Sequence, residues 1–159
     1  MADLGHRASR VVDQQPTVVH DRLLQLAARL RDELPPIEAG TRASTALGMS
    51  GRLDVEIVDR GPGRIELRTT QGRIRGAGAV DLAPTPDGRT SITMNVEIQP
   101  QGFAANLILG VALRTTPGLE RRVIDGLEAN LDDLAKELAK PDAEWDPAAW
   151  QPVGLPSRA

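Results

Sequence analysis

The chain has 159 residues, of which 40% are hydrophobic and 26% charged, as is usual for a folded soluble domain. Its formal net charge of −3 gives no field that would attract a polyanion, so nucleic acid is not an expected partner. Cysteine is absent, which excludes disulfides, thiolate metal ligands and a cysteine nucleophile.

The first ten residues have no apolar stretch of the kind found in a secretory signal. The longest apolar stretch, residues 103–113, is far shorter than the roughly 20 residues that span a bilayer. We therefore expect a cytoplasmic protein without a membrane span. Tyrosine is absent and Phe103 is the only phenylalanine, so the core and any binding pocket must be mainly aliphatic.

The N-terminal part of the chain predicts one strand and one helix. We expect residues 1–7 to be flexible and residues 9–14 to form a short strand. Pro16 is typical of a first helical turn. From Thr17 onward, apolar residues recur at steps of three and four, which predicts a helix that ends at the following proline pair. Residues 38–50 show no periodicity and form either a loop or a short irregular helix.

The middle of the chain alternates apolar and polar residues with period two, which is typical of a half-buried sheet. Turn sequences, such as DRGPG at residues 59–63, separate the alternating runs. Four consecutive strands are therefore predicted, at residues 53–57, 65–69, 74–82 and 92–98. Short turns between neighbouring strands predict an antiparallel meander with one apolar and one wet face.

Two helices are predicted after the meander. Residues 103–113 are apolar on most sides, so this helix is either buried or covers the mouth of a cavity. Pro117 interrupts the pattern, and a strongly amphipathic helix runs from there to about Lys140. Its apolar stripe consists of Leu119, Val123, Leu127, Leu131, Leu134 and Leu138. The stripe and the apolar face of the sheet are expected to bury each other, because neither is stable alone in water.

The last segment, residues 141–159, has four prolines and no periodicity, so we expect an extended or disordered tail. It contains both tryptophans of the chain, Trp145 and Trp150. They could anchor a protein partner, since tryptophan is enriched in binding hot spots, or dock onto the domain's own apolar surface.

The order of these elements resembles the START-like, birch-pollen-allergen superfamily, which includes polyketide cyclases and lipid-transport domains. The resemblance covers about Arg7 to Lys140, and its most typical part is the strand end L-x-P-x-x-D-G-x-T at residues 82–90. The glycine- and leucine-rich sequence QGFAANLILGVALRTTPGLERRVIDGLEANLDDLA is most similar to the carbon-monoxide-dehydrogenase G-like branch. The resemblance implies an α+β helix-grip domain at residues 8–140, in which a curved antiparallel sheet wraps a long C-terminal helix and leaves a cavity for an apolar ligand.

We expect this cavity to be lined by twelve residues: Ile57, Leu67, Ile74, Gly76, Gly78, Met94, Val96, Phe103, Leu107, Val123, Leu127 and Asn130. The strand glycines Gly76 and Gly78 either leave room for ligand or mark a bend in the sheet. Gly126, inside the last helix, indicates either close packing or cavity space. Asn130 either orients a ligand or lies solvated at the boundary of the apolar stripe.

The sequence contains no recognisable catalytic or metal-binding motif. No glycine-rich phosphate loop, nucleophile elbow or zinc motif is present, and His6 and His20 have no partner at metal spacing. His20 and Asp21 are neighbours in a predicted helix and are not expected to face each other. We therefore expect no catalytic residues, metal or cofactor, and a binding or carrier domain for a small lipid-like or polyketide-like molecule. The alternatives are a cyclase-like enzyme acting in the cavity and an assembly factor that works through the tryptophan-bearing tail.

Overall fold

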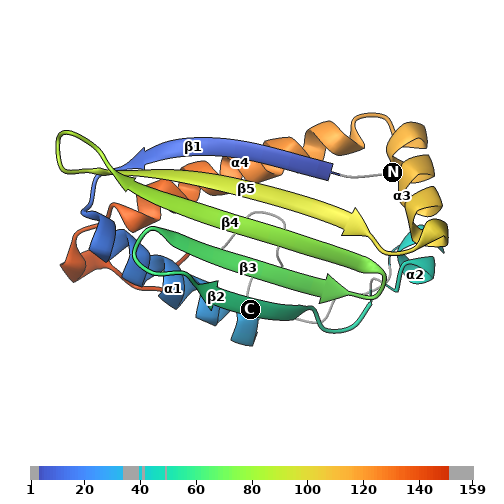
Figure 1. Ribbon diagram of the computed structural model, residues 1–159, viewed down its shortest axis with the longest axis horizontal. Coiled ribbons are helices and arrows are strands. Elements are labelled where there is room, and N and C mark those ends of the chain that lie inside the picture. Colours follow the sequence, from blue (N-terminus) through green and yellow to red (C-terminus); the bar gives the residue numbers. More distant parts are fainter. Residues whose placement is uncertain (1–3, 34–39, 41, 49, 151–159) are drawn as a thin grey trace.

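The computed structural model describes residues 4–33, 40, 42–48 and 50–150, and has an α+β architecture of one sheet and one layer of helices (Figure 1). The antiparallel sheet has the strand order β1-β5-β4-β3-β2. Its strands are β1 (Leu4–Val12), β2 (Asp54–Asp59), β3 (Arg64–Gln71), β4 (Ile74–Pro84) and β5 (Thr90–Pro100). The helices are α1 (Pro16–Glu33), α2 (Arg42–Ala46), α3 (Phe103–Thr115) and α4 (Leu119–Leu138), followed by the 3-10 turn η1 (Asp142–Glu144).

The four predicted meander strands are confirmed as β2 to β5, and the amphipathic helix is confirmed as α4. The unassigned segment 38–50 contains the short helix α2. The first strand begins at Leu4, earlier than the predicted residue 9. Its early part has polar His6 and Arg10 on the side that faces the helices, so the sequence shows no apolar alternation there.

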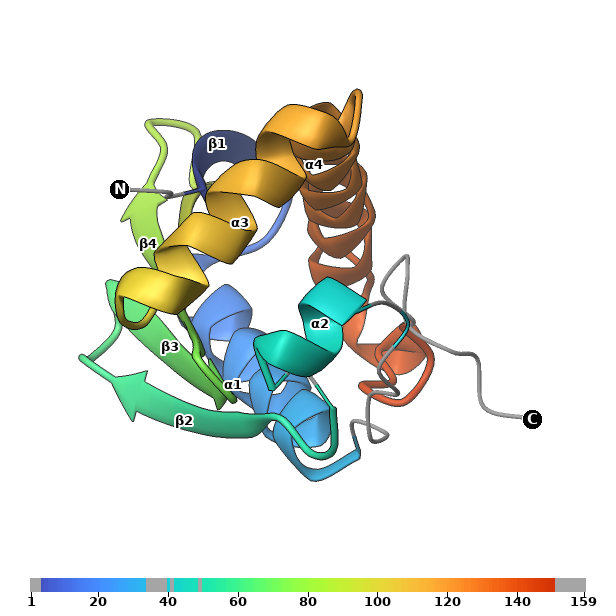
Figure 2. The same cartoon turned by 90° about the vertical axis from the view of Figure 1, so that its right-hand side faces the viewer.

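The strand register defines an inner face of the sheet, which the helices cover, and an outer face. Ala8, Ile65 and Ile92 are buried members of the core and mark the inner face. α4 packs along edge strand β1, while α1 packs on β2 and β4 from the opposite edge. Figure 2 views the molecule along the strands and shows sheet, α1 and α4 as three sides of the fold, with α2 and α3 across one end.

The buried core is concentrated at the end of the molecule away from α3. The sheet, α1 and the C-terminal half of α4 all contribute to this buried core: Ala8, Val12, Val19, Leu23, Leu26, Ile65, Leu82, Ile92, Leu131, Leu134 and Leu138. Leu131, Leu134 and Leu138 are the part of the predicted stripe that is buried in the core. The expectation that stripe and sheet bury each other is therefore met fully in this half of the domain.

At the other end, backbone hydrogen bonds join three segments that are distant in the sequence. The amide of Arg73, in the β3–β4 turn, donates to the carbonyl oxygen of Leu47 over 2.8 Å. The amide of Gln101, just before α3, donates to the carbonyl oxygen of Arg73 over 2.6 Å. Gly72 makes this approach possible, because a Cβ there would lie 2.3 Å from the Leu47 carbonyl oxygen and φ is +57°.

The first of the two alternatives for the apolar helix, that it is buried, is wrong for one side of α3. Ala105 is buried, but Phe103, Leu107 and Val111 are 85%, 57% and 50% exposed. The helix is apolar nearly all round, so its sequence did not indicate which side would face the protein. None of the helices within the described residues combines the length and hydropathy that crossing a membrane requires.

Candidate functional site

The inner face of the sheet is buried at both ends and accessible in the middle. On β5, the inner residues Thr90 and Ile92 are buried at the core end, and Pro100 is buried at the α3 end. Between them, Met94, Val96 and Ile98 are all partly exposed. They nevertheless face the helices, because Met94 is paired with the inner-face residue Ala8 of β1, and Val96 and Ile98 follow it at steps of two along the strand. The helices therefore do not seal the central part of the inner face.

Strand β3 shows the same change in burial along its length, from a buried end through a partly exposed middle to a second buried end. Ile65 is buried at the core end and Gln71 at the α3 end, whereas Leu67 and Thr69 between them are partly exposed. On α4 the exposure also changes along the helix, because Leu131 is buried and Val123 and Leu127 are only partly buried. Three elements thus surround one accessible apolar surface, which we call the central inner surface.

The central inner surface is free of charge on its three middle strands. The inner positions of β3, β4 and β5 carry only apolar residues, glycine, threonine and glutamine: Ile65, Leu67, Thr69, Gln71, Ile74, Gly76, Gly78, Val80, Leu82, Pro84, Thr90, Ile92, Met94, Val96, Ile98 and Pro100. The charged side chains of these strands lie at the alternate positions, on the outer face. This arrangement favours contact with an apolar molecule over contact with a charged one.

Most residues predicted to line the cavity lie around this surface. All seven predicted strand residues are on the inner face: Ile57, Leu67, Ile74, Gly76, Gly78, Met94 and Val96. Ile57 and Met94 pack against the buried core, and Val123, Leu127 and Asn130 of α4 are partly buried. Phe103 and Leu107 are instead exposed on α3 and stand apart from the others.

The glycines differ in the space that surrounds them. A Cβ at Gly76 would lie 2.3 Å from the Thr69 hydroxyl oxygen, so Thr69 already fills the space above this glycine. At Gly78 the nearest atoms would be 3.9 Å away, which is ordinary contact and leaves the inner side of the strand open. A Cβ at Gly126 would meet nothing within 4 Å, so close packing does not explain that glycine.

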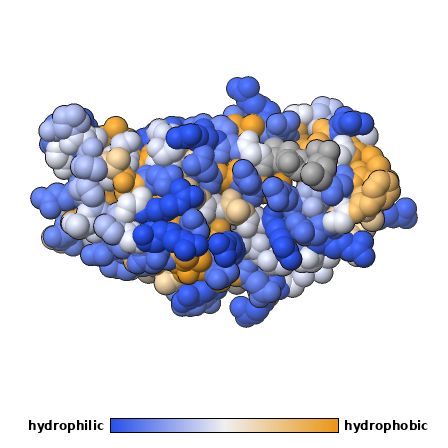
Figure 3. Space-filling view, in the orientation of Figure 1, coloured by the Kyte–Doolittle hydropathy of each residue, from blue (hydrophilic) through white to orange (hydrophobic). Residues whose placement is uncertain are grey.

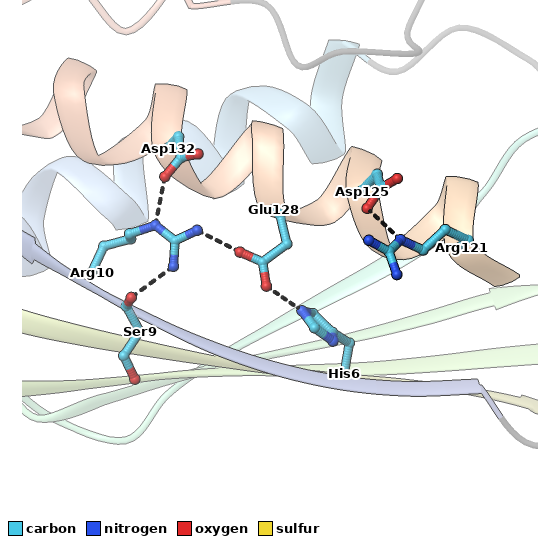
Figure 4. Close-up of polar contacts among 7 residues, drawn as sticks. All are labelled: His6, Ser9, Arg10, Arg121, Asp125, Glu128 and Asp132. Carbon is cyan, nitrogen blue, oxygen red and sulfur yellow. Dashed lines mark hydrogen bonds and ion pairs between the residues drawn. The ribbon is translucent and has the colours of Figure 1, made fainter.

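A cluster of charged side chains ties α4 to edge strand β1 (Figure 4). Glu128 accepts one hydrogen bond on each carboxylate oxygen, from His6 at 2.7 Å and from the Arg10 guanidinium. Arg10 also donates from Nε to Asp132 over 2.5 Å, one turn further along α4. These hydrogen bonds lower the pKa of Glu128. The hydrogen bond from His6 has the largest effect, and the one from Arg10 has the next largest. A carboxylate whose two oxygens are both engaged is suited to holding the helix in place.

A second His–carboxylate contact lies at the opposite edge of the sheet and links α1 to β2. His20 Nε2 lies 2.9 Å from Asp59, and this hydrogen bond, together with one from the Gly61 amide, lowers the pKa of Asp59. The expectation that His20 and Asp21 do not face each other is wrong, because His20 Nδ1 lies 3.6 Å from the Asp21 carboxylate.

Sequence reasoning missed both edge contacts, since the partners lie far apart along the chain. The only available signal was the presence of polar residues where the strand pattern required apolar ones. Together the two contacts attach the helices at the edges of the sheet, so the strands between the edges can keep an uncharged inner face.

The segment after α4 lies against α1. Trp145 Nε1 donates to Gln25 over 3.0 Å, and the Arg22 guanidinium lies 4.8 Å from the centre of the Trp145 ring. Arg29 donates to the carbonyl oxygens of Pro147 and Trp150. Of the two alternatives for the tryptophans, the described part of the tail shows the contact with the domain itself. Residues 151–159 of the predicted tail lie outside the described residues.

The outer face carries a shallow groove that the sequence analysis did not identify. Its two adjoining parts, of about 280 and 320 Å³, share Arg68, Ala77 and Glu97. Ala77 and Ala79 are consecutive outer-face residues of β4, between Arg75 and Asp81, and their small side chains lie between the longer residues of β3 and β5. The groove lies on the opposite side of the sheet from the central inner surface, although the inner-face residues Leu67, Thr69, Gly76 and Gly78 also border it. Figure 3, which views this outer face, shows it to be predominantly hydrophilic.

No protein-family model matches the chain, and no curated protein matches it. Solved structures do match, at low sequence identity. A Chromobacterium violaceum protein is 16% identical, with a TM-score of 0.54, over 87% of this chain and 99% of that one. One half of the di-domain aromatase/cyclase StfQ from the steffimycin pathway is similar at 12% identity and a TM-score of 0.52, with coverage of 87% and 50%.

A Thalictrum norcoclaurine synthase, solved with a transition-state analogue, is similar at 11% identity and a TM-score of 0.51. The match covers 86% of this chain and 94% of the synthase. At such identities a structural match establishes the fold alone. The predicted α+β helix-grip fold is therefore confirmed.

Proposed function

We propose that this protein is a non-catalytic binding or carrier domain for a small apolar molecule, held between the sheet and α4. The observation that carries the proposal is the accessible central inner surface between two buried ends. Val96 and Leu67, in the middle of the sheet, remain partly exposed while Ile92 and Ile65 are buried. A ligand that covers this apolar surface removes it from water, which favours binding by about 25 cal/mol for each Å² that is buried.

The lining indicates the chemical class of the ligand. Aliphatic side chains and glycines dominate it, and the described inner positions of β3, β4 and β5 include no aromatic ring. Thr69 and Asn130 supply hydroxyl and amide groups close to this surface. This combination suits a lipid-like or polyketide-like molecule with a long apolar part and few polar groups. We also propose that the chain is related to the carbon-monoxide-dehydrogenase G-like branch of the superfamily.

The alternative is a cyclase-like reaction in the same space. It is motivated by the structural similarity to the aromatase/cyclase StfQ and to norcoclaurine synthase. Acid–base catalysis requires a titratable group within reach of the ligand. The inner positions of the three middle strands have none, and Glu128 is held by His6 and Arg10. These observations support binding without catalysis.

The proposal can be tested with a pair of neighbouring substitutions on β4. Gly78→Val adds an isopropyl side chain to the central inner surface, where the nearest atoms to a Cβ are 3.9 Å away. Ala79→Val is the control: it places a valine at the neighbouring position on the outer face, because successive strand residues point to opposite sides. Valine is favoured in strands, so both variants are expected to fold.

The measurement is native mass spectrometry of the purified protein, with extraction and identification of any passenger, followed by titration of the identified ligand. We expect one apolar molecule per chain, and about tenfold weaker binding to Gly78→Val, since overpacking costs about 1.4 kcal/mol. Ala79→Val should bind as the original protein does. Unchanged affinity in Gly78→Val, or equal loss in both variants, would place the ligand elsewhere.

A further inference from the structure

The exposed side of α3 carries a stripe of large apolar side chains. Phe103, Leu107 and Val111 follow one another at steps of four, which places them on one side of the helix. Their exposed fractions of 85%, 57% and 50% make them three of the four exposed large hydrophobic residues among those described; the fourth is Val11. Figure 3 shows hydrophobic atoms gathered at this end of the molecule.

The same end of the molecule is basic, although the whole chain is acidic. Three segments meet there: residues 42–48 and 50–54 with α2, residues 70–77 at the β3–β4 turn, and residues 99–122 with α3 (Figure 2). Together they contain seven arginines and only two carboxylates, against a net charge of −3 for the chain. The arginines are Arg42, Arg52, Arg73, Arg75, Arg114, Arg121 and Arg122.

We propose that the α3 end docks on an anionic phospholipid surface, with the stripe inserted among the acyl chains and the arginines at the headgroups. A helix with an apolar side and flanking cationic residues binds in the interfacial region of a bilayer. Thirteen residues are too few to span a bilayer but suffice to lie in its surface. Anionic lipid contributes about fivefold in affinity for each arginine near the surface. The proposal does not depend on the ligand proposed above.

A second copy of the chain fits this surface less well. A twofold contact through α3 would bring two basic ends together, with no matching acidic patch in the segments that surround the stripe. A groove-forming protein partner would need acidic side chains around an apolar cleft. A lipid surface requires neither feature, because its apolar interior and anionic headgroups match the stripe and the arginines directly.

The test uses flotation of the full chain with vesicles of phosphatidylcholine alone and of phosphatidylcholine mixed with phosphatidylglycerol. We expect binding to the mixed vesicles only, decreasing as salt is raised. Val111→Ser and Val11→Ser form a matched pair, because the two valines are equally exposed at 50% but only Val111 belongs to the stripe. Val111→Ser should weaken vesicle binding several-fold and Phe103→Ser about tenfold, while Val11→Ser leaves it unchanged.

The charge contribution has its own matched pair. Arg114→Gln at the end of α3 should weaken binding about fivefold, whereas Arg89→Gln, in the β4–β5 turn at the opposite end, should not. Absence of binding to mixed vesicles would overturn the proposal. So would a dimer in solution that Phe103→Ser dissociates, which would assign the stripe to a second copy. Binding of poly-glutamate without vesicle binding would assign it to an acidic protein.

The two proposals can fail separately. Vesicle binding is measured with lipid composition and α3 variants, and ligand binding with Gly78→Val, which lies on the inner face of β4. Gly78→Val is therefore expected to float with mixed vesicles as the original protein does. Loss of flotation in this variant alone would make the bound ligand, and not α3, responsible for lipid association.

Discussion

Arg22 Nη1, on α1, donates to the carbonyl oxygen of Leu138 over 2.9 Å, at the C-terminal end of α4. The last carbonyl groups of a helix have no partner within the helix, and a cation there also interacts favourably with the helix dipole. Arg22 is buried to 3% exposure, donates in addition to the carbonyl of Lys140, and lies over the ring of Trp145. One side chain therefore joins the first long helix, the end of the last helix and the segment that follows it.

We predict that Arg22→Ala lowers the free energy of unfolding by about 3 kcal/mol, because it leaves buried carbonyl groups without donors. The measurement is urea denaturation followed by circular dichroism. Arg31→Ala, which removes an exposed arginine paired with Asp32 on the same helix, is the control and should leave the free energy of unfolding nearly unchanged. Equal effects in the two variants would contradict the capping role of Arg22.

The cluster around Glu128 predicts a component of acid sensitivity. The hydrogen bonds from His6 and Arg10 hold the pKa of Glu128 in the folded protein below its ordinary value of 4.5. A lowered carboxyl pKa stabilises the folded state fully above pH 4.5, and this contribution is lost as the pH falls through the lowered value. Glu128→Gln should therefore lower the thermal unfolding temperature at neutral pH and flatten its decrease below pH 4.5.

Glu120→Gln controls for the loss of one negative charge, since Glu120 is exposed in the first turn of the same helix. Thermal unfolding temperatures of all three proteins would be recorded from neutral pH into the acid range. A decrease in Glu128→Gln as steep as in the original protein would show that another group is responsible.

The change in burial along α4 predicts unequal effects of two leucines that are four residues apart. Leu131→Ala should lower the free energy of unfolding by about 3 kcal/mol, because Leu131 is fully buried in the core at 1% exposure. Leu127→Ala should lower it by about 1 kcal/mol, since Leu127 borders the accessible central inner surface. Chemical denaturation of ligand-free protein gives both values. Equal values would mean that the interior is packed along the whole of α4.

The two strand glycines are predicted to respond in opposite directions. Gly76→Ala should lower stability by about 1 kcal/mol, because its Cβ would lie 2.3 Å from the Thr69 hydroxyl oxygen. Gly78→Ala should raise stability by about 0.5 kcal/mol, since the position has room and alanine restricts the unfolded chain. In a Thr69→Ala background, Gly76→Ala should no longer be unfavourable. Thermal unfolding of the four variants completes this double-mutant comparison.

Local patterns were sufficient to predict most of the secondary structure. Strands β2 to β5 alternate with period two and are separated by glycine-containing turns, and both properties belong to short stretches of sequence. The same is true of the stripe on α4, whose period places six residues on one side whatever they pack against. These patterns predicted the inner face of the sheet as well, since strand parity follows from the sequence once the strand is assigned.

Contacts between distant residues were not predictable in this way. His6 and Glu128 are 122 positions apart, and only the crossing of α4 over β1 brings them within 2.7 Å. The polarity of His6 and Arg10 also obscured the start of the first strand. The exposed stripe on α3 has the same origin, because a helix that is apolar nearly all round gives no local signal of which side will contact the protein.

The sequence by itself determined the order of the main elements and the inner and outer sides of strands β2 to β5, because periodicity and turn chemistry are local. The expectation of a helix-grip fold came from the resemblance to the START-like superfamily. Only the tertiary structure decided where the inner face is sealed and where it stays accessible, which charged residues meet at the sheet edges, and which side of α3 faces solvent. Those features depend on how far helices and sheet approach one another. That distance is set by all the packed side chains together and by no single stretch of the chain.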